Sequence, residues 1–202
     1  YNLIGYEAKL ENARLHYFMN NFDLAKAHLD ILKRSTTKLI ANDALELSLF
    51  IETNTIGDSS ELALKEYASV SLLIYQNKFI EAQNRLKLLV DTWLGHPIRD
   101  DSFWLLIKLQ KKTGKYEEAI NSLNVLINEY SDGVLGDDAL FMKAAILEEH
   151  LNNPSKALKI YKQFLSDFPG SAYVVEARKR YRLLRTDLNL SLIHISEPTR
   201  PY

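Results

Sequence analysis

The acidic and basic residues of the chain do not converge on a predicted catalytic site. Catalysis needs groups with adjusted proton affinities that meet in one place. Glu148, Glu149 and His150 are adjacent on a predicted helix, so their side chains point in different directions. They lack the spacing of one helical turn that lets two side chains share a metal ion. We expect an ordinary exposed helix end there.

The histidines and the cysteine count point the same way. His16, His28 and His96 are far apart in the sequence and are expected to be surface or partly buried residues. The chain has no cysteine, which removes disulfides, thiolate zinc sites and cysteine nucleophiles together. We therefore predict no enzyme activity, no metal and no cofactor.

Two acidic pairs, Asp100/Asp101 and Asp137/Asp138, lie where helices are predicted to start. Carboxylate oxygens at such positions accept hydrogen bonds from the first free amides, and their negative charge suits the helix dipole. We predict helix capping rather than acid–base chemistry for both pairs.

Composition indicates an ordinary folded chain. The 202 residues include 25 Lys+Arg and 26 Asp+Glu, so the net charge is −1 and gives no electrostatic footprint for nucleic acid. With 47% hydrophobic residues, the chain is too apolar to be disordered. It lacks an apolar run near the ~20 residues that span a bilayer, so no membrane span is predicted.

Helices are predicted throughout. The seven glycines and five prolines lie mostly at boundaries, and apolar residues recur at spacings of three and four. Ten helices are expected, at about 3–19, 22–34, 39–54, 59–76, 79–93, 99–112, 115–130, 137–151, 154–167 and 171–187.

A short sequence motif, aromatic-x-x-Ala, recurs at the start of every second helix in most of the chain. The segments Phe22–Ala25, Phe79–Ala82 and Tyr116–Ala119 match it, and Pro154–Ala157 keeps the alanine. The last three alanines are 37 and 38 residues apart. A second motif begins at the two acidic pairs, Asp100/Asp101 and Asp137/Asp138, which are 37 residues apart. Small alanines would let paired helices approach closely, so the pattern predicts stacked helix hairpins.

This pattern resembles the tetratricopeptide repeat family. The best copy runs from Asp101 to Tyr130, and the next contains Ala144, Ala157 and Pro169. The resemblance implies an all-α, right-handed α-solenoid of degenerate repeats. The period of 37 to 38 is longer than usual for the family, and Ile107 stands where a small residue is common. The motif from Tyr161 to Ser171, followed by Ala177, resembles the long-period bacterial variants of the family. The segments Ala41 to Leu47 and Val175 to Arg185 resemble the C-terminal region of large repeat proteins from Bacteroidota.

The repeat is irregular near the middle of the first half, because Ala63 and Ala82 are only 19 residues apart. Either the 59–76 helix closes one repeat and opens the next, or the 39–54 helix is an insertion. The sequence favours the shared helix, with Leu62, Tyr67 and Leu73 among its packing residues.

The resemblance also implies where a partner binds, because the first helices of such repeats line the concave groove. A Trp with Lys neighbours suits a peptide that carries apolar and acidic groups. The chaperone-binding clamp of some family members is not expected, since apolar residues stand among the positions it needs. The predicted partner-binding residues are Asp101, Trp104, Lys108, Lys111, Lys112, Met142, Ile146 and Glu149.

The last predicted helix is rich in positive charge. It carries Arg178, Lys179, Arg180, Arg182 and Arg185. This pattern is typical of a solvated helix end, and the alternative is a docking patch for an acidic partner or a lipid headgroup.

The ends of the chain look non-native. The chain starts at Tyr1 inside a helical pattern, and Leu190 to Arg200 can be read as the translation of a transposase-type sequencing adapter. We expect a repeat domain over 1–189, truncated at its N-terminus, and an adapter-derived tail over 190–202.

The predicted function is a non-catalytic scaffold that binds a protein or peptide, with the oligomeric state left open. Two alternatives are an assembly component of the bacterial envelope, which would place the chain in the periplasm or envelope, and a helical appendage of an enzyme.

Overall fold

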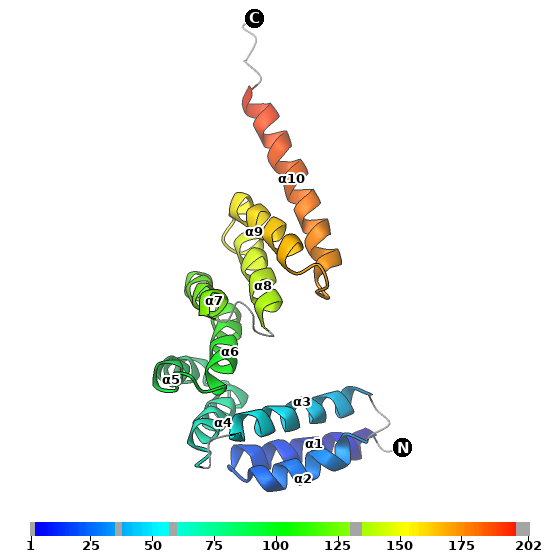
Figure 1. Ribbon diagram of the computed structural model, residues 1–202, viewed down its shortest axis with the longest axis vertical. Helices are drawn as coiled ribbons and strands as arrows, with labels where there is room; N and C mark the ends of the chain where they lie inside the picture. The colour runs from blue at the N-terminus through cyan, green and yellow to red at the C-terminus, as the bar shows by residue number, and fades with distance from the viewer. Residues whose placement is uncertain (1–2, 35–37, 57–59, 130–134, 197–202) are drawn as a thin grey trace, which may run out of the picture. The chain divides into compact units, whose positions relative to one another are not determined.

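The computed structural model describes residues 3–34, 38–56, 60–129 and 135–196, with side chains described over 4–34, 38–56, 60–129 and 135–187. Within these ranges the chain forms ten α-helices and no strand (Figure 1). They are α1 (Leu3–Phe18), α2 (Phe22–Leu32), α3 (Lys38–Thr55), α4 (Leu62–Tyr75), α5 (Phe79–Thr92), α6 (Ile98–Lys112), α7 (Tyr116–Glu129), α8 (Gly136–Glu149), α9 (Pro154–Asp167) and α10 (Val174–Ser196). Contacts divide the chain into two compact units, Tyr1–Ser102 and Phe103–Tyr202.

The repeated alanines lie in helix contacts, as the sequence pattern predicts. Ala25, Ala82, Ala119 and Ala157 each have 0% of their surface exposed. They stand in the first turns of α2, α5, α7 and α9. Neighbouring helices cover each alanine methyl group completely. The close approach of these helices therefore depends on the small size of alanine at this position.

A left-handed residue stands at the end of the preceding helix in three hairpins. Asn20, Asn77 and Gly114 have φ values of 62°, 60° and 75°. The next residue then donates its amide to a carbonyl five residues back, a pattern that satisfies the last free carbonyls of a helix. These bonds are Asn21 to His16 (2.9 Å), Lys78 to Leu73 (2.8 Å) and Lys115 to Gln110 (2.9 Å). In each hairpin the turn is followed directly by the aromatic residue of the aromatic-x-x-Ala motif.

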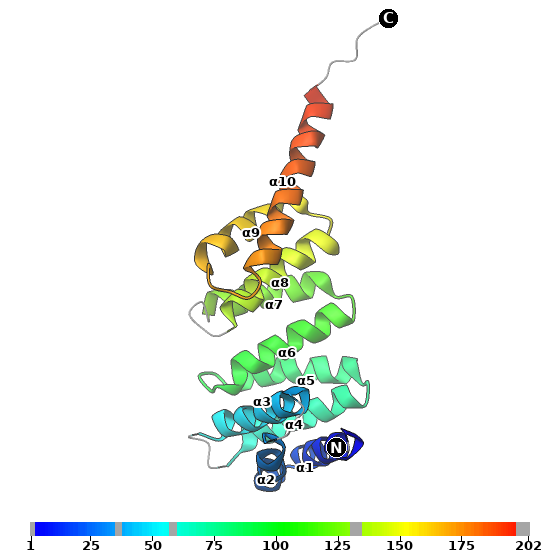
Figure 2. The ribbon, with the colours of Figure 1, turned by 90° about the vertical axis from the view of Figure 1, so that its right-hand side faces the viewer.

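The first unit has a packing order that the sequence did not predict. Helix α2 packs against α1 and α3, and both views of the unit show these three helices side by side (Figures 1 and 2). Helix α4 packs mainly against α5 and touches α1 and α3 only lightly. A helix shared between two hairpins would pack closely against α3, so the shared-helix prediction is wrong. The packing supports the insertion of α3.

Of the three packing residues predicted on α4, two are confirmed. Leu73 is buried, and Tyr67 packs against the core of the first unit, where its ring lies 4.8 Å from that of Phe50. Leu62 is 54% exposed because it opens the helix on the solvent side.

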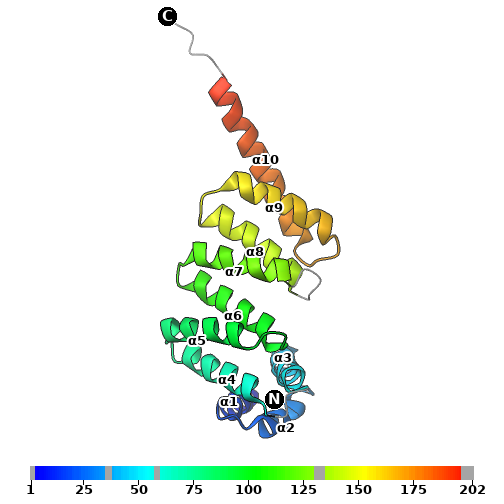
Figure 3. The same cartoon turned by 60° about the vertical axis from the view of Figure 1, so that its left-hand side comes forward.

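The second unit is a run of adjacent helices. Helix α8 packs against α7 and α9, and α9 packs against α10 (Figure 3). The largest fully buried side chains in its C-terminal half are Tyr161 and Phe164 of α9. They lie with Ala144 of α8 and Ala177 of α10 in one apolar cluster. Consecutive hairpin-like packing of this kind is typical of α-helical repeat arrays.

Helix α10 extends beyond its predicted end at 187 and reaches Ser196. The sequence has no glycine or proline between Asp187 and Pro198, so nothing in it stops the helix earlier. The predicted adapter-derived tail lies partly in this last stretch of helix, and its residues 197–202 lie outside the described part of the chain. Among the described residues, no helix is both long enough and apolar enough to span a bilayer.

Candidate partner-binding surface

Helix α6 carries the most exposed part of the predicted surface. Trp104 and Lys108 are four residues apart and therefore lie on one face. Trp104 is half-buried, Lys108 is exposed, and the Lys108 Nζ atom lies 5.8 Å from the centre of the indole ring. This distance is within the range of a cation–π interaction. The pair presents an aromatic surface beside a positive charge.

Lys111 and Lys112 stand in the last turn of α6, where positive charge is favourable beside the free carbonyls. Lys111 is half-buried and Lys112 is exposed. Both extend the positive charge of Lys108 toward the end of the helix, so four of the eight predicted residues lie on one stretch of α6.

Asp101 has a structural partner within the first unit. Its Oδ2 atom accepts a hydrogen bond of 3.2 Å from the Nδ2 atom of Asn54, which is fully buried. Asn54 also donates to the Phe50 carbonyl at 3.0 Å. The Asp101 carboxylate thereby accepts a hydrogen bond from a buried amide group. A partner that binds Asp101 would have to leave this hydrogen bond in place.

The acidic pairs lie in the first turns of α6 and α8, where their charge suits the helix dipole as predicted, but they do not cap these helices. Helix α6 begins at Ile98, and the cap residue of α8 is Leu135, which makes no side-chain cap hydrogen bond. Asp100 instead bonds to the next residue. Its Oδ1 atom accepts a hydrogen bond of 2.9 Å from the Asp101 amide, in the first turn of α6. Burial raises the pKa of the Asp100 carboxyl, while the backbone hydrogen bonds act in the opposite direction. Asp137 accepts an equivalent bond of 2.9 Å from the Asp138 amide at the start of α8.

The predicted residues of α8 differ in exposure. Met142 is half-buried and remains a candidate, but Ile146 is fully buried, so its assignment to an exposed surface is wrong. Helix α8 is packed between α7 and α9, and this covers most of its apolar side chains. The family resemblance placed Ile146 by position, whereas its apolar character fits the core.

Glu149 belongs to an ion-pair cluster that joins α8 and α10. Its Oε1 atom lies 3.1 Å from Arg180 Nη2, and Glu148 Oε1 lies 3.2 Å from Arg180 Nη1. Arg180 Nε also donates to Glu176 Oε1 at 2.8 Å. These contacts raise the pKa of Arg180 and lower that of Glu176, in each case mainly through the hydrogen bond between them. Glu149 therefore has a structural role before any partner arrives.

The sequence did not indicate this cluster, because its members lie about thirty residues apart. Tyr161 adds to it by donating a hydrogen bond of 2.8 Å to Glu148 Oε2, and burial raises the pKa of its hydroxyl. His150 points elsewhere and stacks on Tyr116, with ring centres 4.1 Å apart. The predicted divergence of these three side chains is thus wrong for Glu148 and Glu149, which both reach Arg180, and correct for His150. The helix end is held by ion pairs and is not the ordinary exposed end that was expected.

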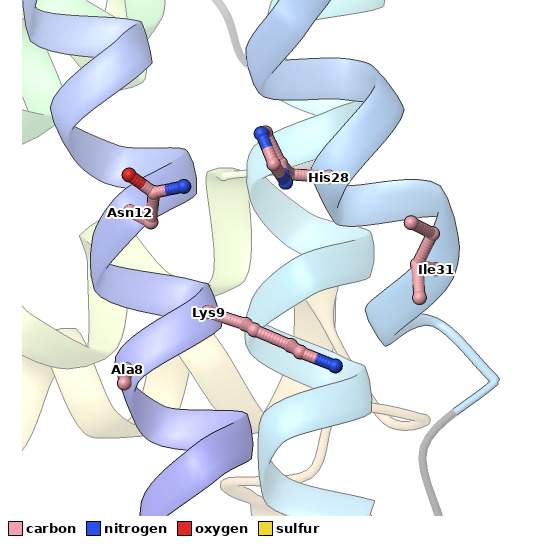
Figure 4. A pocket seen from close by; sticks show the side chains of 5 residues that line it. All are labelled: Ala8, Lys9, Asn12, His28 and Ile31. Atoms are coloured by element: carbon pink, nitrogen blue, oxygen red, sulfur yellow. The ribbon is translucent and has the colours of Figure 1, made fainter.

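Two of the scattered histidines meet between α1 and α2. The rings of His16 and His28 are parallel within 4°, with centres 5.2 Å apart. Lone pairs of imidazole lie in the ring plane, so two parallel rings do not aim their nitrogens at one ion. His28 also lines a pocket with Lys9, Asn12 and Ile31 (Figure 4). Among the described residues there is no group of three or more acidic or histidine side chains that could hold a metal ion.

Comparison with known proteins bears on the same helices. The model of the family described as tetratricopeptide repeat matches residues 101–133 and 138–171. The match supports a tetratricopeptide-type repeat protein. Its two segments begin in the first turns of α6 and α8 and end after α7 and α9, so each covers one helix hairpin. None of the curated proteins compared with the chain is similar to it.

In tetratricopeptide repeats, binding to other proteins is the general role. The two matched hairpins contain all eight predicted residues, and Ile146 is the one that the structure removes from the exposed set.

Proposed function

We propose that this chain is a non-catalytic scaffold that binds a segment of a partner protein on the first helices of its tetratricopeptide-type repeats. The observation that carries the proposal is the pair formed by the half-buried Trp104 and the exposed Lys108 on the first helix of a matched repeat. All-helical repeats of this type are typically non-catalytic, and their exposed helix faces serve as binding surfaces.

The residues on α6 define the chemistry of the partner segment. Trp104 offers an apolar ring that is already half-covered, so a partner side chain can complete its burial at little entropic cost. Lys108, Lys111 and Lys112 add positive charge within two turns of the helix. A segment with an aliphatic or aromatic residue next to acidic residues complements this surface.

The test is a selection from a random peptide library on the full chain, followed by affinity measurements by fluorescence anisotropy. The expected peptides are enriched in apolar and acidic residues. Changing Trp104→Ala and Lys108→Ala together should weaken binding by about tenfold or more, because anchor residues of this kind typically contribute over 1 kcal/mol each.

Two further variants keep the result interpretable. Lys108→Glu reverses an exposed charge without touching the core and should weaken binding on its own. Lys162→Ala, on an exposed site of α9, is the matched control and should bind as the wild type does. If the double variant and Lys108→Glu both retain full affinity, the surface on α6 is not the binding site.

A further inference from the structure

A separate groove lies in the second unit, between α7, α8 and α9. Its volume is about 340 Å³, which is at the small end of the range for ligand sites. The apolar part of its lining comes from each of the three helices, through Ile120, Leu147 and Ile160. The surface on α6 described above contributes no residue to it.

Three lysines surround this apolar lining. Lys143 of α8 is half-buried, and Lys156 and Lys159 stand in the first turns of α9. Within the part of the chain that the structure describes, none of the three ammonium groups has a carboxylate within ion-pair distance. Glu117 also lines the groove and forms no ion pair with them. The groove therefore holds an excess of positive charge.

Two further features favour a negative ligand. Burial lowers the pKa of Lys143, as expected for an ammonium group that has lost water without gaining a counter-charge. The groove also reaches the start of α9, where Asn153 caps the helix and the helix dipole adds partial positive charge.

We propose that this groove binds an amphiphilic organic anion, with a carboxylate or phosphate headgroup between Lys143, Lys156 and Lys159 and an aliphatic chain on the apolar lining. The anion supplies the missing counter-charge, and the chain covers apolar surface that is otherwise open to water. The proposal is independent of the partner surface on α6.

The test is a titration of the full chain, followed by NMR of the isoleucine methyl groups. The probes are octanoate and octyl phosphate, each below its micelle concentration. Both headgroups should give saturable shifts at Ile120 and Ile160, and the tighter of the two identifies the preferred headgroup. Octyl glucoside has the same chain without charge, and inorganic phosphate has charge without a chain. Each should bind at least about tenfold more weakly.

Variants locate the headgroup. Lys143→Met keeps the aliphatic stem and removes the charge, and it should weaken anion binding by about tenfold, as should Lys156→Met with Lys159→Met. Lys162→Met, on the same helix but outside the groove, is the control and should leave binding unchanged. Equal affinity for octyl glucoside, unchanged binding in the lysine variants, or the absence of saturable shifts at these isoleucines would each overturn the proposal.

Discussion

Four alanine side chains without exposed surface hold the helix pairs at close distance, and each can be tested by enlargement. Ala119→Leu or Ala157→Leu adds three heavy atoms at a site with no exposed surface. We expect each substitution to lower the free energy of unfolding by about 1–3 kcal/mol. Chemical denaturation with circular dichroism measures this loss.

Ala27→Leu is the matched control, because Ala27 lies on the exposed side of α2. It should change stability by no more than about 0.5 kcal/mol. Unchanged unfolding in both buried-site variants would show that these alanines do not set the helix spacing.

Arg180 is the residue that joins three glutamates, and its removal should destabilise the second unit. In Arg180→Met, Glu148 and Glu149 of α8 and Glu176 of α10 lose their shared cation. The pKa of Glu176 is lowered in the folded protein, so its stabilising contribution is present above the ordinary pKa of about 4.3 and is lost as the pH falls below it.

The expected signature is a gap in melting temperature between wild type and Arg180→Met that is full near neutral pH and narrows below about pH 4. Arg178→Met removes a neighbouring charge that has no ion-pair partner among the described residues, and it should give no such gap. A gap that stays constant from neutral to acidic pH would rule out the ion pairs as its cause.

At the scale of elements, the helices were more predictable than their pairing. Periodicity places all ten, since a buried apolar stripe and a turn residue are local features of the sequence. The packing partners of α4 were harder to predict. The 19-residue spacing between Ala63 and Ala82 allowed two arrangements, and only the packing of α3 against α2 rather than against α4 distinguishes them.

Helix α10 offers a prediction of its own. Its last residue in the apolar cluster of described side chains is Leu184, one turn beyond Arg180. Deletion of Leu190 to Tyr202 should therefore leave the melting temperature unchanged, as measured by differential scanning calorimetry. A fall of several degrees would instead mean that the terminal segment contributes to the folded core.

At the scale of the whole chain, the predicted partner-binding residues differ in how accessible the structure leaves them. Trp104 and Lys108 are accessible on α6, because their spacing is set by the helix itself. Ile146 and Glu149 were placed by family position alone. In the structure Ile146 is fully buried, and Glu149 forms an ion pair with Arg180. The lysine groove could not be predicted, because it needs three helices in register and lysines that form no ion pair with Glu117, which also lines it.

The left-handed turns at Asn20, Asn77 and Gly114 limit how this chain can vary in length. Each turn joins two helices through three residues and satisfies the carbonyls of the helix before it, so it has no slack for an inserted residue. Growth of a repeat from the usual 34 residues to 37 or 38 must then occur elsewhere: in the helices, in the links between hairpins, or in the α8–α9 turn, where residues 150–153 join the helices. For the protein engineer, those links are the places for an epitope tag or a grafted loop, and the three turns are the places to avoid.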